Sequence, residues 1–552
     1  MSNETGSRTG RPPTFAPRAM VAAPHYLATS AGLDVLRRGG SAVDAAIAVN
    51  AVLAVVYPHW CGIGGDGFWL VHDPRRGGVE GLNASGPAAR LATRDYYRER
   101  GHPEEIPARG PLAALTVPGA VDGWRMAHER FGRLPWEELF ADAVRYAREG
   151  APVARSLASW LSRRLDQLAG HSAASLVTGG RGPLREGARV AHPGLADTLE
   201  RIARRGAREG FYEGETAERI CCALQPGGSP LRPEDFAAFR AEWVEPVSTE
   251  YRGLTLHELP PNSQGFTALQ ILNLVEGFDV GAWGDGTADY YHHLAEAVKL
   301  ALADRDEWLT DPRFVDVPLR RLLSKEYAAE RRRLIDPDRA LPVGGVAPGI
   351  RFGPAARRTP LAGDTCYFCA VDGEGMAASV IQSLYQEFGS MEAGGDTGVI
   401  LQNRGTCFSL DDRHPNRLEP GKRTFHTLMP AMAFRGGEPY LAFGTMGGNG
   451  QAQTHAALVT RIVDFGYDVQ QAIEAPRWVV GRTLGRDVEE LHLEGRTSHA
   501  VVGELFARGH DVRMAMDWDE DMGHAQAIRI HRDTGLLEGG ADPRGDGAAL
   551  GF

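Results

Sequence analysis

Long apolar runs are missing from this chain. No stretch approaches the roughly 18 consecutive apolar residues that a transmembrane helix requires, so we expect no segment that crosses a membrane. Residues 1–17 are polar, contain prolines and lack the apolar core of about 7–15 residues that marks a secretory signal. We therefore expect a cytoplasmic protein that begins with a disordered lead-in over residues 1–17.

Basic charge is also scarce. The chain has 60 Lys and Arg against 71 Asp and Glu, which gives a net charge of −11. Nucleic acids and anionic membranes attract basic surfaces, so this balance argues against both as partners. Histidine, cysteine and acidic residues show no spacing typical of a zinc site. We expect neither a metal nor a cofactor.

Cysteine is rare, with 6 in 552 residues, and only one pair has the spacing of a redox or metal motif. That pair, Cys366 and Cys369, falls in a run rich in Tyr, Phe and Val that is typical of a strand. Side chains alternate between the two faces of a strand, so residues three apart point in opposite directions. We interpret both as buried thiols and not as ligands.

Three glycines, Gly62, Gly64 and Gly67, match the G-x-G-x-x-G pattern of dinucleotide-binding sites. That pattern requires a strand before it and a helix after it. Here a helical pattern over 42–56 precedes the glycines, and a strand pattern over 68–72 follows them. We therefore expect no nucleotide site, and we interpret the glycines as permitting close backbone approach near a ligand.

Helical and strand patterns occur in blocks along the chain. Helical patterns cover 31–38, 42–56, 115–160, 196–204, 216–224, 265–276 and 290–309, and strand patterns cover 68–72, 365–371, 376–384, 399–401, 431–435 and 440–443. Such blocks predict helix layers on a pair of sheets, an α+β fold. Residues 337–363 are rich in Pro, Gly and Arg without periodicity, which is typical of a flexible functional or linker segment.

Thr365 follows this segment and begins a predicted β-hairpin over 365–384. A threonine at the head of a strand becomes chain-terminal if the preceding peptide bond breaks. Its new α-amine can then act as the general base for its own hydroxyl. By itself the position is more typical of an ordinary strand start, and the surrounding motifs change that interpretation.

A series of motifs resembles the γ-glutamyltransferase family, whose members are amino-terminal-nucleophile (Ntn) hydrolases with an N-terminal threonine. In chain order the matching segments are 39–46, 58–68, 260–265, 303–305, 365–384, 403–405, 423–430, 444–450, 475–477 and 542–547. The resemblance spans roughly residues 18–550. It implies a four-layer αββα sandwich and self-cleavage between Asp364 and Thr365. A large subunit (18–364) and a small subunit (365–552) would stay associated, and further oligomerisation is left open.

The resemblance also implies the catalytic residues. Thr365 corresponds to the nucleophile, and Ser383 to the hydroxyl residue that hydrogen-bonds to it. Gly447 and Gly448 correspond to the oxyanion hole, because successive backbone N–H groups in a glycine-rich turn can converge on a developing oxyanion.

The acyl-binding pocket departs from the family pattern at several positions. Ser85 stands where γ-glutamyl enzymes have the arginine that holds the substrate α-carboxylate. His426 and Thr427 replace two consecutive serines that assist this arginine, and Tyr385 replaces an asparagine. The loss of the arginine predicts that γ-glutamyl amides are poor substrates.

The amine-binding part of the pocket is also altered. Arg404 and Cys407 correspond roughly to the amide and acidic residues that bind the substrate α-amino group. An α-amino group would therefore face a cation or no acid at all. Arginine binds a planar carboxylate through two hydrogen bonds, so we expect Arg404 to hold a substrate carboxylate. The alternative is that Arg404 is an ordinary solvated side chain.

This altered residue set resembles the subgroup that includes oxamate amidohydrolases. It equally resembles members of natural-product pathways that hydrolyse a C–C bond next to an oxalyl group. We expect an autoprocessing hydrolase that cleaves a short amide or oxalyl-type acyl bond of a small molecule through a threonine acyl-enzyme. Two alternatives stay open, a γ-glutamyltransferase or glutathione hydrolase with an altered pocket, and a non-catalytic binding protein on the same fold.

Overall fold

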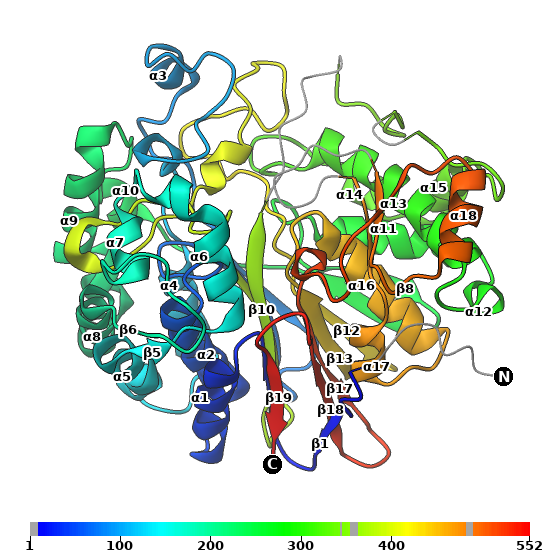
Figure 1. Cartoon of the computed structure of the whole chain (residues 1–552), viewed down its shortest axis with the longest axis horizontal. Helices are drawn as coiled ribbons and strands as arrows, with labels where there is room; N and C mark the ends of the chain where they lie inside the picture. The colour runs from blue at the N-terminus through cyan, green and yellow to red at the C-terminus, as the bar shows by residue number, and fades with distance from the viewer. Residues whose placement is uncertain (1–8, 343–344, 354–362, 482–489) are drawn as a thin grey trace.

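Two seven-stranded sheets lie face to face at the centre of the molecule, and helices cover both outer faces (Figure 1). The computed structural model describes residues 9–342, 345–353, 363–481 and 490–552. Within these residues, no helix has both the length and the apolar character needed to cross a bilayer. The arrangement confirms the α+β class and the four-layer αββα sandwich.

The first sheet contains the strands that follow the expected cleavage point. In spatial order its strands are β19 (Ala548–Gly551), β2 (Met20–Ala23), β10 (Asp364–Val371), β11 (Ala377–Tyr385), β3 (Asp66–His72), β4 (Glu80–Ala84) and β7 (Glu242–Val244). The hairpin of β10 and β11 thus lies between β2 and β3 and is antiparallel to both. One sheet therefore contains strands from both sides of the expected cleavage point, with β10 and β11 between strands of the first part of the chain, an arrangement that would hold two cleaved subunits together.

The second sheet is also antiparallel. In spatial order its strands are β1 (Thr14–Ala16), β18 (Leu537–Ala541), β17 (Ala525–Ile530), β13 (Glu438–Thr445), β12 (Ala431–Arg435), β9 (Leu254–Glu258) and β8 (Val247–Tyr251). Short strands elsewhere are β5 (Ala151–Pro152), β6 (Arg189–Val190), β14 (Trp478–Val480), β15 (Leu491–Leu493) and β16 (Val512–Met514).

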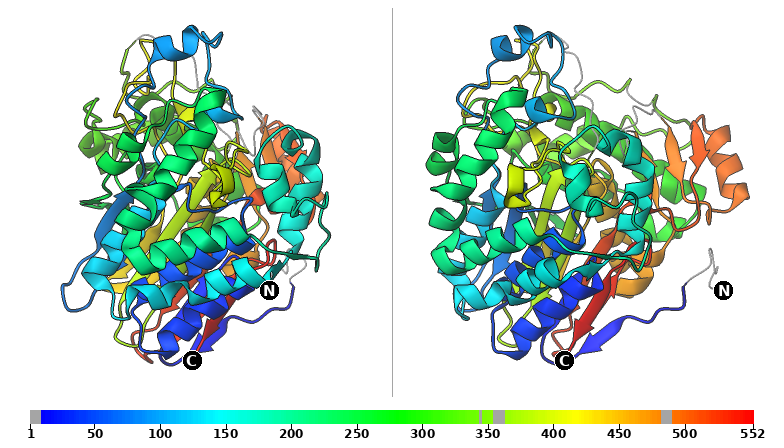
Figure 2. Two further views of the ribbon diagram at one scale, coloured as in Figure 1. Left: turned by 90° about the vertical axis from the view of Figure 1, so that its left-hand side faces the viewer. Right: turned by 60° about the vertical axis from the view of Figure 1, so that its left-hand side comes forward.

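Each sheet carries its own layer of helices, which Figure 2 shows from two further directions. The layer on the first sheet includes α1 (Tyr26–Arg37), α2 (Ala42–Val56), α4 (Ala120–Phe131), α5 (Ala141–Glu149) and α8 (Pro193–Ala207). The layer on the second sheet includes α11 (Gly265–Val275), α13 (Ala288–Trp308), α16 (Gly450–Val463) and α17 (Val469–Glu474). The remaining α-helices are α3 (Arg94–Arg98), α6 (Arg155–Leu168), α7 (Ala173–Thr178), α9 (Glu215–Leu224), α10 (Pro233–Ala238), α12 (Val280–Trp283), α14 (Leu319–Leu322), α15 (Lys325–Arg332) and α18 (His499–Ala507).

Helix α2 packs against β10 and β11 and has the bounds that its sequence predicts, 42–56. It is apolar almost all round, and every one of its residues is buried. Ser41 and Asp44 form a capping box, in which the Ser41 hydroxyl accepts the Asp44 N–H at 3.0 Å and the Asp44 carboxylate accepts the Ser41 N–H at 2.9 Å. Such a cap contributes about 1 kcal/mol, and it fixes where the helix begins beneath the hairpin.

The core between the two sheets is built from alternate residues of their strands. Phe68, Tyr367 and Cys369 point into it from the first sheet, and Met432 meets them from the second. Cys366 points the other way, into the core beneath α2. The structure therefore confirms that Cys366 and Cys369 are buried on opposite faces of one strand.

Four expectations differ from the structure or lie partly outside it. The expected helical pattern over 115–160 is wrong for Ala151–Pro152, which form β5 between α5 and α6. The expected disorder over 1–17 is wrong for residues 14–16, which form β1 by pairing with β18, whereas residues 1–8 lie outside the described residues. The expected strand over 399–401 is wrong, because Ile400 and Leu401 make only isolated bridges. In the expected flexible segment 337–363, residues 345–353 form neither helix nor strand, and 343–344 and 354–362 lie outside the described residues.

Candidate active site

The candidate active site lies at one end of the first sheet, where β10 begins, β11 ends and β3 begins. Antiparallel pairing brings these three ends together, with Asp364 opposite Tyr385 and Ser383 opposite Asp66. The register shifts between Asp364 and Cys366, where two residues of β11, Ser383 and Leu384, stand opposite Thr365 alone, so the extra residue of this bulge belongs to β11. A bulge of this kind re-aims a side chain away from the regular ladder. Thr365 is only 1% exposed, and its hydroxyl has no hydrogen-bond partner among the described residues.

Ser383 is part of this bulge, on the strand next to Thr365. Its hydroxyl accepts the backbone N–H of Tyr385 at 2.7 Å, which holds the turn that follows β11. The glycine-rich loop packs directly on it, because a Cβ on Gly65 would lie 2.1 Å from the Ser383 carbonyl oxygen. A helix precedes this loop and β3 follows it, as predicted, so the glycines serve backbone approach within the protein.

Gly447 and Gly448 approach the same place from the second sheet. They follow β13, precede α16 and have positive φ angles of 123° and 52°. A Cβ on Gly448 would lie 2.6 Å from the carbonyl oxygen of Gly363, the second residue before Thr365. The turn therefore touches the chain segment that leads to the expected cleavage point. The N-terminus of α16 adds a partial positive charge there.

Side chains from three of the sequence motifs brace this glycine turn. Gln264 Nε2 donates to the Gly448 carbonyl at 3.1 Å and to the Thr427 carbonyl at 2.8 Å. Arg305 Nη1 donates to Gln264 Oε1 at 2.9 Å and to Asn449 Oδ1 at 2.7 Å. Sequence reasoning had matched Gln264 and Arg305 to the family without a role. The structure assigns them to holding the turn in place.

Arg404 begins the 3₁₀ helix η6 (Arg404–Cys407), and its side chain is buried, with 1% exposure. The guanidinium carbon lies 4.1 Å from the centre of the Tyr385 ring, and Nη1 donates to Thr427 Oγ1 at 3.3 Å. Its Nε and Nη2 have no hydrogen-bond partner within the described part of the chain. The alternative of a solvated arginine is therefore wrong. Burying a cation is costly, by several kcal/mol, unless carboxylates and hydrogen bonds balance it, and Asp66 is an acidic group that interacts electrostatically with Arg404.

Tyr385 connects Arg404 to the cleavage point. It has a positive φ of 82°, which is rare for a residue with a side chain. A Cβ on Gly363 would lie 2.5 Å from the Tyr385 ring, so the segment before Thr365 packs on this ring. In the uncleaved chain, Gly363 thus lies between Tyr385 and the Gly448 turn.

His426 lies on the other side of Arg404, and it pairs with a residue that sequence reasoning missed. Its Nε2 is 3.1 Å from Oδ2 of Asp66, at the start of β3, although this oxygen is left without a properly aimed hydrogen bond among the described residues. The other carboxylate oxygen, Oδ1, accepts the N–H groups of Gly86 at 3.1 Å and Gly119 at 3.0 Å. The sequence signal that could have identified Asp66 is its position as an acidic residue within a glycine-rich loop.

The two groups of this pair have shifted pKa values. Burial raises the pKa of Asp66 to about 7, against the opposing effects of its backbone hydrogen bonds and Arg404. Burial, together with Arg404 and Arg423, lowers the pKa of His426 well below its ordinary value. The imidazole is therefore neutral near pH 7, and the carboxyl group takes up a proton before the ring does.

Ser85 lies nearby, but its side chain is engaged within the protein. Its hydroxyl donates to Asn83 Oδ1 at 2.6 Å and accepts from Asn262 Nδ2 at 3.1 Å. The backbone carbonyl of Asn262 in turn accepts the backbone N–H of His426 at 2.6 Å. A direct contact between Ser85 and substrate stays a prediction.

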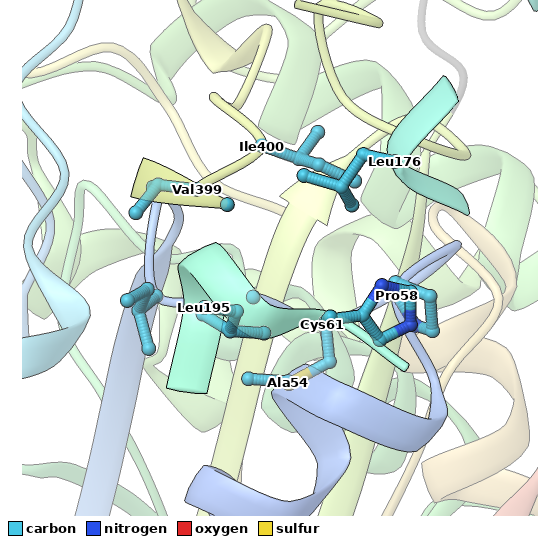
Figure 3. A pocket seen from close by; sticks show the side chains of 11 residues that line it. Ala54, Pro58, Cys61, Leu176, Leu195, Val399 and Ile400 are labelled. Atoms are coloured by element: carbon cyan, nitrogen blue, oxygen red, sulfur yellow. The ribbon is translucent and has the colours of Figure 1, made fainter. Parts of the chain in front are cut away.

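Two other features were considered as binding sites. His292, Glu296 and His510 form a group with metal-ligand spacing in the described chain, but Lys299 bonds Glu296 at 2.7 Å and the two rings contact each other at 2.8 Å. These interactions occupy the atoms that face one another, and His292 Nε2 also contacts the Asp336 carbonyl at 2.7 Å, whereas His510 Nδ1 has no partner among the described residues. A hollow of about 10 Å³ behind the glycine-rich loop is lined mainly by apolar side chains (Figure 3) and has room for about one water molecule.

Comparisons with known proteins agree with this geometry. The family model described as Gamma-glutamyltranspeptidase matches residues 28–552. The chain is 46% identical over 537 residues to the glutathione hydrolase-like YwrD proenzyme of Bacillus subtilis, covering 97% of this chain and 98% of that one. It is 43% identical over 541 residues to the oxamate amidohydrolase proenzyme of Klebsiella pneumoniae, again covering 97% and 98%.

A solved structure agrees as well. The crystal structure of cephalosporin acylase from Bacillus halodurans superposes with a TM-score of 0.90 at 38% identity, over 100% of this chain and 98% of that chain. The motifs, the fold and these comparisons lead to one conclusion: the chain is an enzyme of the gamma-glutamyltranspeptidase family of Ntn hydrolases.

Proposed function

We propose that this protein cuts itself between Asp364 and Thr365 and that Thr365 then hydrolyses the amide of a small acyl donor carrying a carboxylate, of the oxamate type. The observation that carries the proposal is the buried guanidinium of Arg404, which packs on the Tyr385 ring and whose Nε and Nη2 have no hydrogen-bond partner among the described residues. A bidentate carboxylate is the ligand that satisfies such a fork.

The chemistry follows from an N-terminal threonine. Thr365 Oγ1 attacks the carbonyl carbon of the donor, and the α-amine of Thr365 takes the hydroxyl proton and passes it to the leaving nitrogen. The N–H groups of Gly447 and Gly448 stabilise the oxyanion of each tetrahedral intermediate. Water then attacks the ester carbon, the carboxylic acid leaves, and the threonine hydroxyl is restored.

The uncleaved chain suggests how self-cleavage would open the pocket. Gly363 packs on the ring of Tyr385 and against Gly448, so the segment before Thr365 fills the space in front of the glycine turn. Once the Asp364–Thr365 bond breaks, this segment is no longer tethered to β10. Its departure would leave Arg404, Tyr385 and the oxyanion hole around one vacated space, into which an acyl donor fits.

The charge of this space favours a carboxylate over an α-ammonium group. Arg404 repels an ammonium group, and Cys407 offers no counter-charge, since burial raises the pKa of its thiol. The relative named as an oxamate amidohydrolase supports a short oxo-acid donor, and the relative named glutathione hydrolase-like keeps the γ-glutamyl alternative testable.

The experiment is a substrate screen with the purified, self-cleaved protein. Ammonia or amine release is measured with oxamate, other short carboxylate-bearing amides, glutathione and a γ-glutamyl anilide. We expect oxamate-type amides to react well. The γ-glutamyl compounds should be slower by about ten- to a hundredfold, the usual effect of one missing charged hydrogen bond. Robust glutathione turnover with no reaction of oxamate-type amides would overturn the proposal.

A further inference from the structure

Asp66 and His426 lie near Ser383, on the strand next to the proposed nucleophile, and near Arg404. Asp66 is directly opposite Ser383 on neighbouring antiparallel strands, where side chains leave the sheet on the same face with Cβ atoms about 5 Å apart. His426 reaches Asp66 from the segment before β12, with Nε2 3.1 Å from Oδ2. Its neighbour Thr427 accepts a hydrogen bond from Arg404.

Three nitrogen atoms of this group are unpaired. Nδ1 of His426 is buried without a hydrogen-bond partner among the described residues, and so are Nε and Nη2 of Arg404. Buried polar atoms in folded proteins are nearly always paired with protein or a ligand. Two of the three are fixed donors, and the third is a donor only when the imidazole carries its proton on Nδ1.

We propose that Asp66 and His426 share one proton, and that this pair presents Nδ1–H of His426 as a donor to an oxalyl-type acyl group held by Arg404. The inference rests on the proposed function and deepens it. An oxalyl group has two adjacent carbonyl carbons, so it offers a carboxylate to Arg404 and further oxygen acceptors to His426. Asp66 is then a positioning residue, which acts by fixing the tautomer of His426.

The tautomer follows from where the proton of the pair resides. When Asp66 carries it, a small rotation of the ring or the carboxyl group aims Oδ2–H at Nε2, which lies 3.1 Å away, and the ring keeps its own proton on Nδ1. When Asp66 is ionised, the ring proton faces the carboxylate from Nε2, and Nδ1 offers only a lone pair. That lone pair repels an anionic oxygen of the acyl donor. The imidazole is neutral in both forms, so the pair gains or loses a single proton.

The surroundings of the pair favour the protonated form up to about neutral pH. Burial raises the pKa of Asp66 to about 7, and Arg404 on η6 and Arg423 on the segment before His426 keep the ring neutral. Tyr212 also faces Asp66 and stays neutral, since burial raises its pKa well above the ordinary value. As the pH rises through about 7, the proton leaves and the donor is lost. Affinity for an oxalyl anion should then fall, by up to about tenfold per pH unit.

The test is the inhibition constant of oxalate, whose charge is constant between pH 6 and 9, for the self-cleaved wild type and for Asp66→Asn. An asparagine can accept the Gly86 and Gly119 N–H groups through Oδ1, as Asp66 does. Its amide N–H then donates to Nε2 and fixes the proton on Nδ1. We expect the wild-type constant to rise at least tenfold from pH 7 to 8.5. Asp66→Asn should rise clearly less and bind oxalate more tightly than the wild type at pH 8.5.

Two variants at the partner residue provide a second test. His426→Asn keeps an amide N–H near the position of Nδ1 and should bind oxalate with little pH dependence. His426→Gln places no donor there and should bind weakly at every pH. Self-cleavage of each variant reports whether it has folded. Equal oxalate affinity and pH dependence in these two variants would contradict the role of Nδ1.

The α-amine of Thr365 has an ordinary pKa of about 7.7–8.0. Its titration adds the same pH dependence to the oxalate inhibition constant of every variant. Only the part of this pH dependence that the Asp66→Asn substitution removes is due to Asp66 and His426. The inference is overturned if this variant retains the whole wild-type pH dependence while oxamate-type amides are still hydrolysed. A wild type that hydrolyses no such amide would instead overturn the proposed function.

Discussion

The two halves of the candidate site differ in how completely the protein satisfies its own polar groups. In the half that would break the bond, the Gly447–Gly448 turn is braced by Gln264 and Arg305, and hydrogen bonds hold the carbonyl of Gly448. In the half that would bind the acyl group, Arg404 and His426 are buried, and within the described part of the chain some of their nitrogen atoms have no hydrogen-bond partner. In the first half the turn is held in place without a ligand, although the Thr365 hydroxyl has no partner among the described residues. In the second half, a substrate would supply the partners that the buried arginine and histidine lack.

The largest expected effect comes from removing the nucleophile. Thr365→Ala should stay a single uncleaved chain and should hydrolyse no amide, because both reactions need the same hydroxyl. Thr365→Ser is the matched control, since it keeps a hydroxyl and should still cut itself. Denaturing gels and amide turnover measure the two outcomes. Cleavage of the alanine variant at residue 364 would remove Thr365 from the mechanism.

A methyl group on the glycine turn should have the next largest effect and should impair both reactions. A Cβ on Gly448 would lie 2.6 Å from the Gly363 carbonyl oxygen, and φ is 52°. We expect Gly448→Ala to fold, to cut itself slowly and to lose about 10²–10³ in kcat, the usual effect of one lost oxyanion donor. A time course of self-cleavage followed by kcat of the cleaved fraction tests this. Near-normal values of both would place the oxyanion hole elsewhere.

Changing Arg404 should impair hydrolysis of the substrate but leave self-cleavage unchanged. Arg404→Lys keeps the positive charge but loses the planar fork, so kcat/KM for an oxamate-type amide should fall about ten- to a hundredfold. Self-cleavage needs no substrate carboxylate and should proceed at the normal rate. Arg404→Gln is the control that removes the charge as well, and it should lose more activity. Unchanged kinetics in both variants would remove Arg404 from the site, and loss of self-cleavage in both would assign it to folding.

The smallest effect is expected at Ser85, whose hydroxyl is engaged by Asn83 and Asn262. Ser85→Ala should change kcat/KM by less than about threefold, because the hydroxyl is bonded within the protein and its loss removes little transition-state binding. It should lower stability by about 1–2 kcal/mol, because two buried amides lose a partner. Thermal unfolding and kinetics of the variant measure both. A large loss of kcat/KM with unchanged stability would instead make Ser85 a substrate contact.

Local patterns predicted the core of the fold well. Residues 42–56 and 431–435 form the predicted elements with the predicted bounds, because helix capping and strand alternation depend on residues that are close in sequence. Strand β1 was missed because its stability comes from pairing with β18, at the opposite end of the chain. The apolar run 399–401 was misread because a short run carries no information about which partner strand is available.

The site was predictable only where a motif resembled the family. Thr365, Ser383 and the two glycines come from such motifs, and the structure brings them to one end of the sandwich. Asp66 was missed because its importance comes from standing opposite Ser383 and beside His426, neither of which is near it in sequence. The unpaired state of Arg404 depends on burial by distant segments, which the sequence alone does not report.

The most direct test of the account is the N-terminal sequence and intact mass of the fragments of the purified protein. We predict two fragments that stay associated, of which the smaller begins Thr365-Cys366-Tyr367 and ends at Phe552. Brief exposure to a slowly hydrolysed oxalyl-type donor should add one acyl group to that fragment alone. A single intact chain, a different new terminus or an acyl group on the larger fragment would contradict the central claim that Thr365 is the nucleophile.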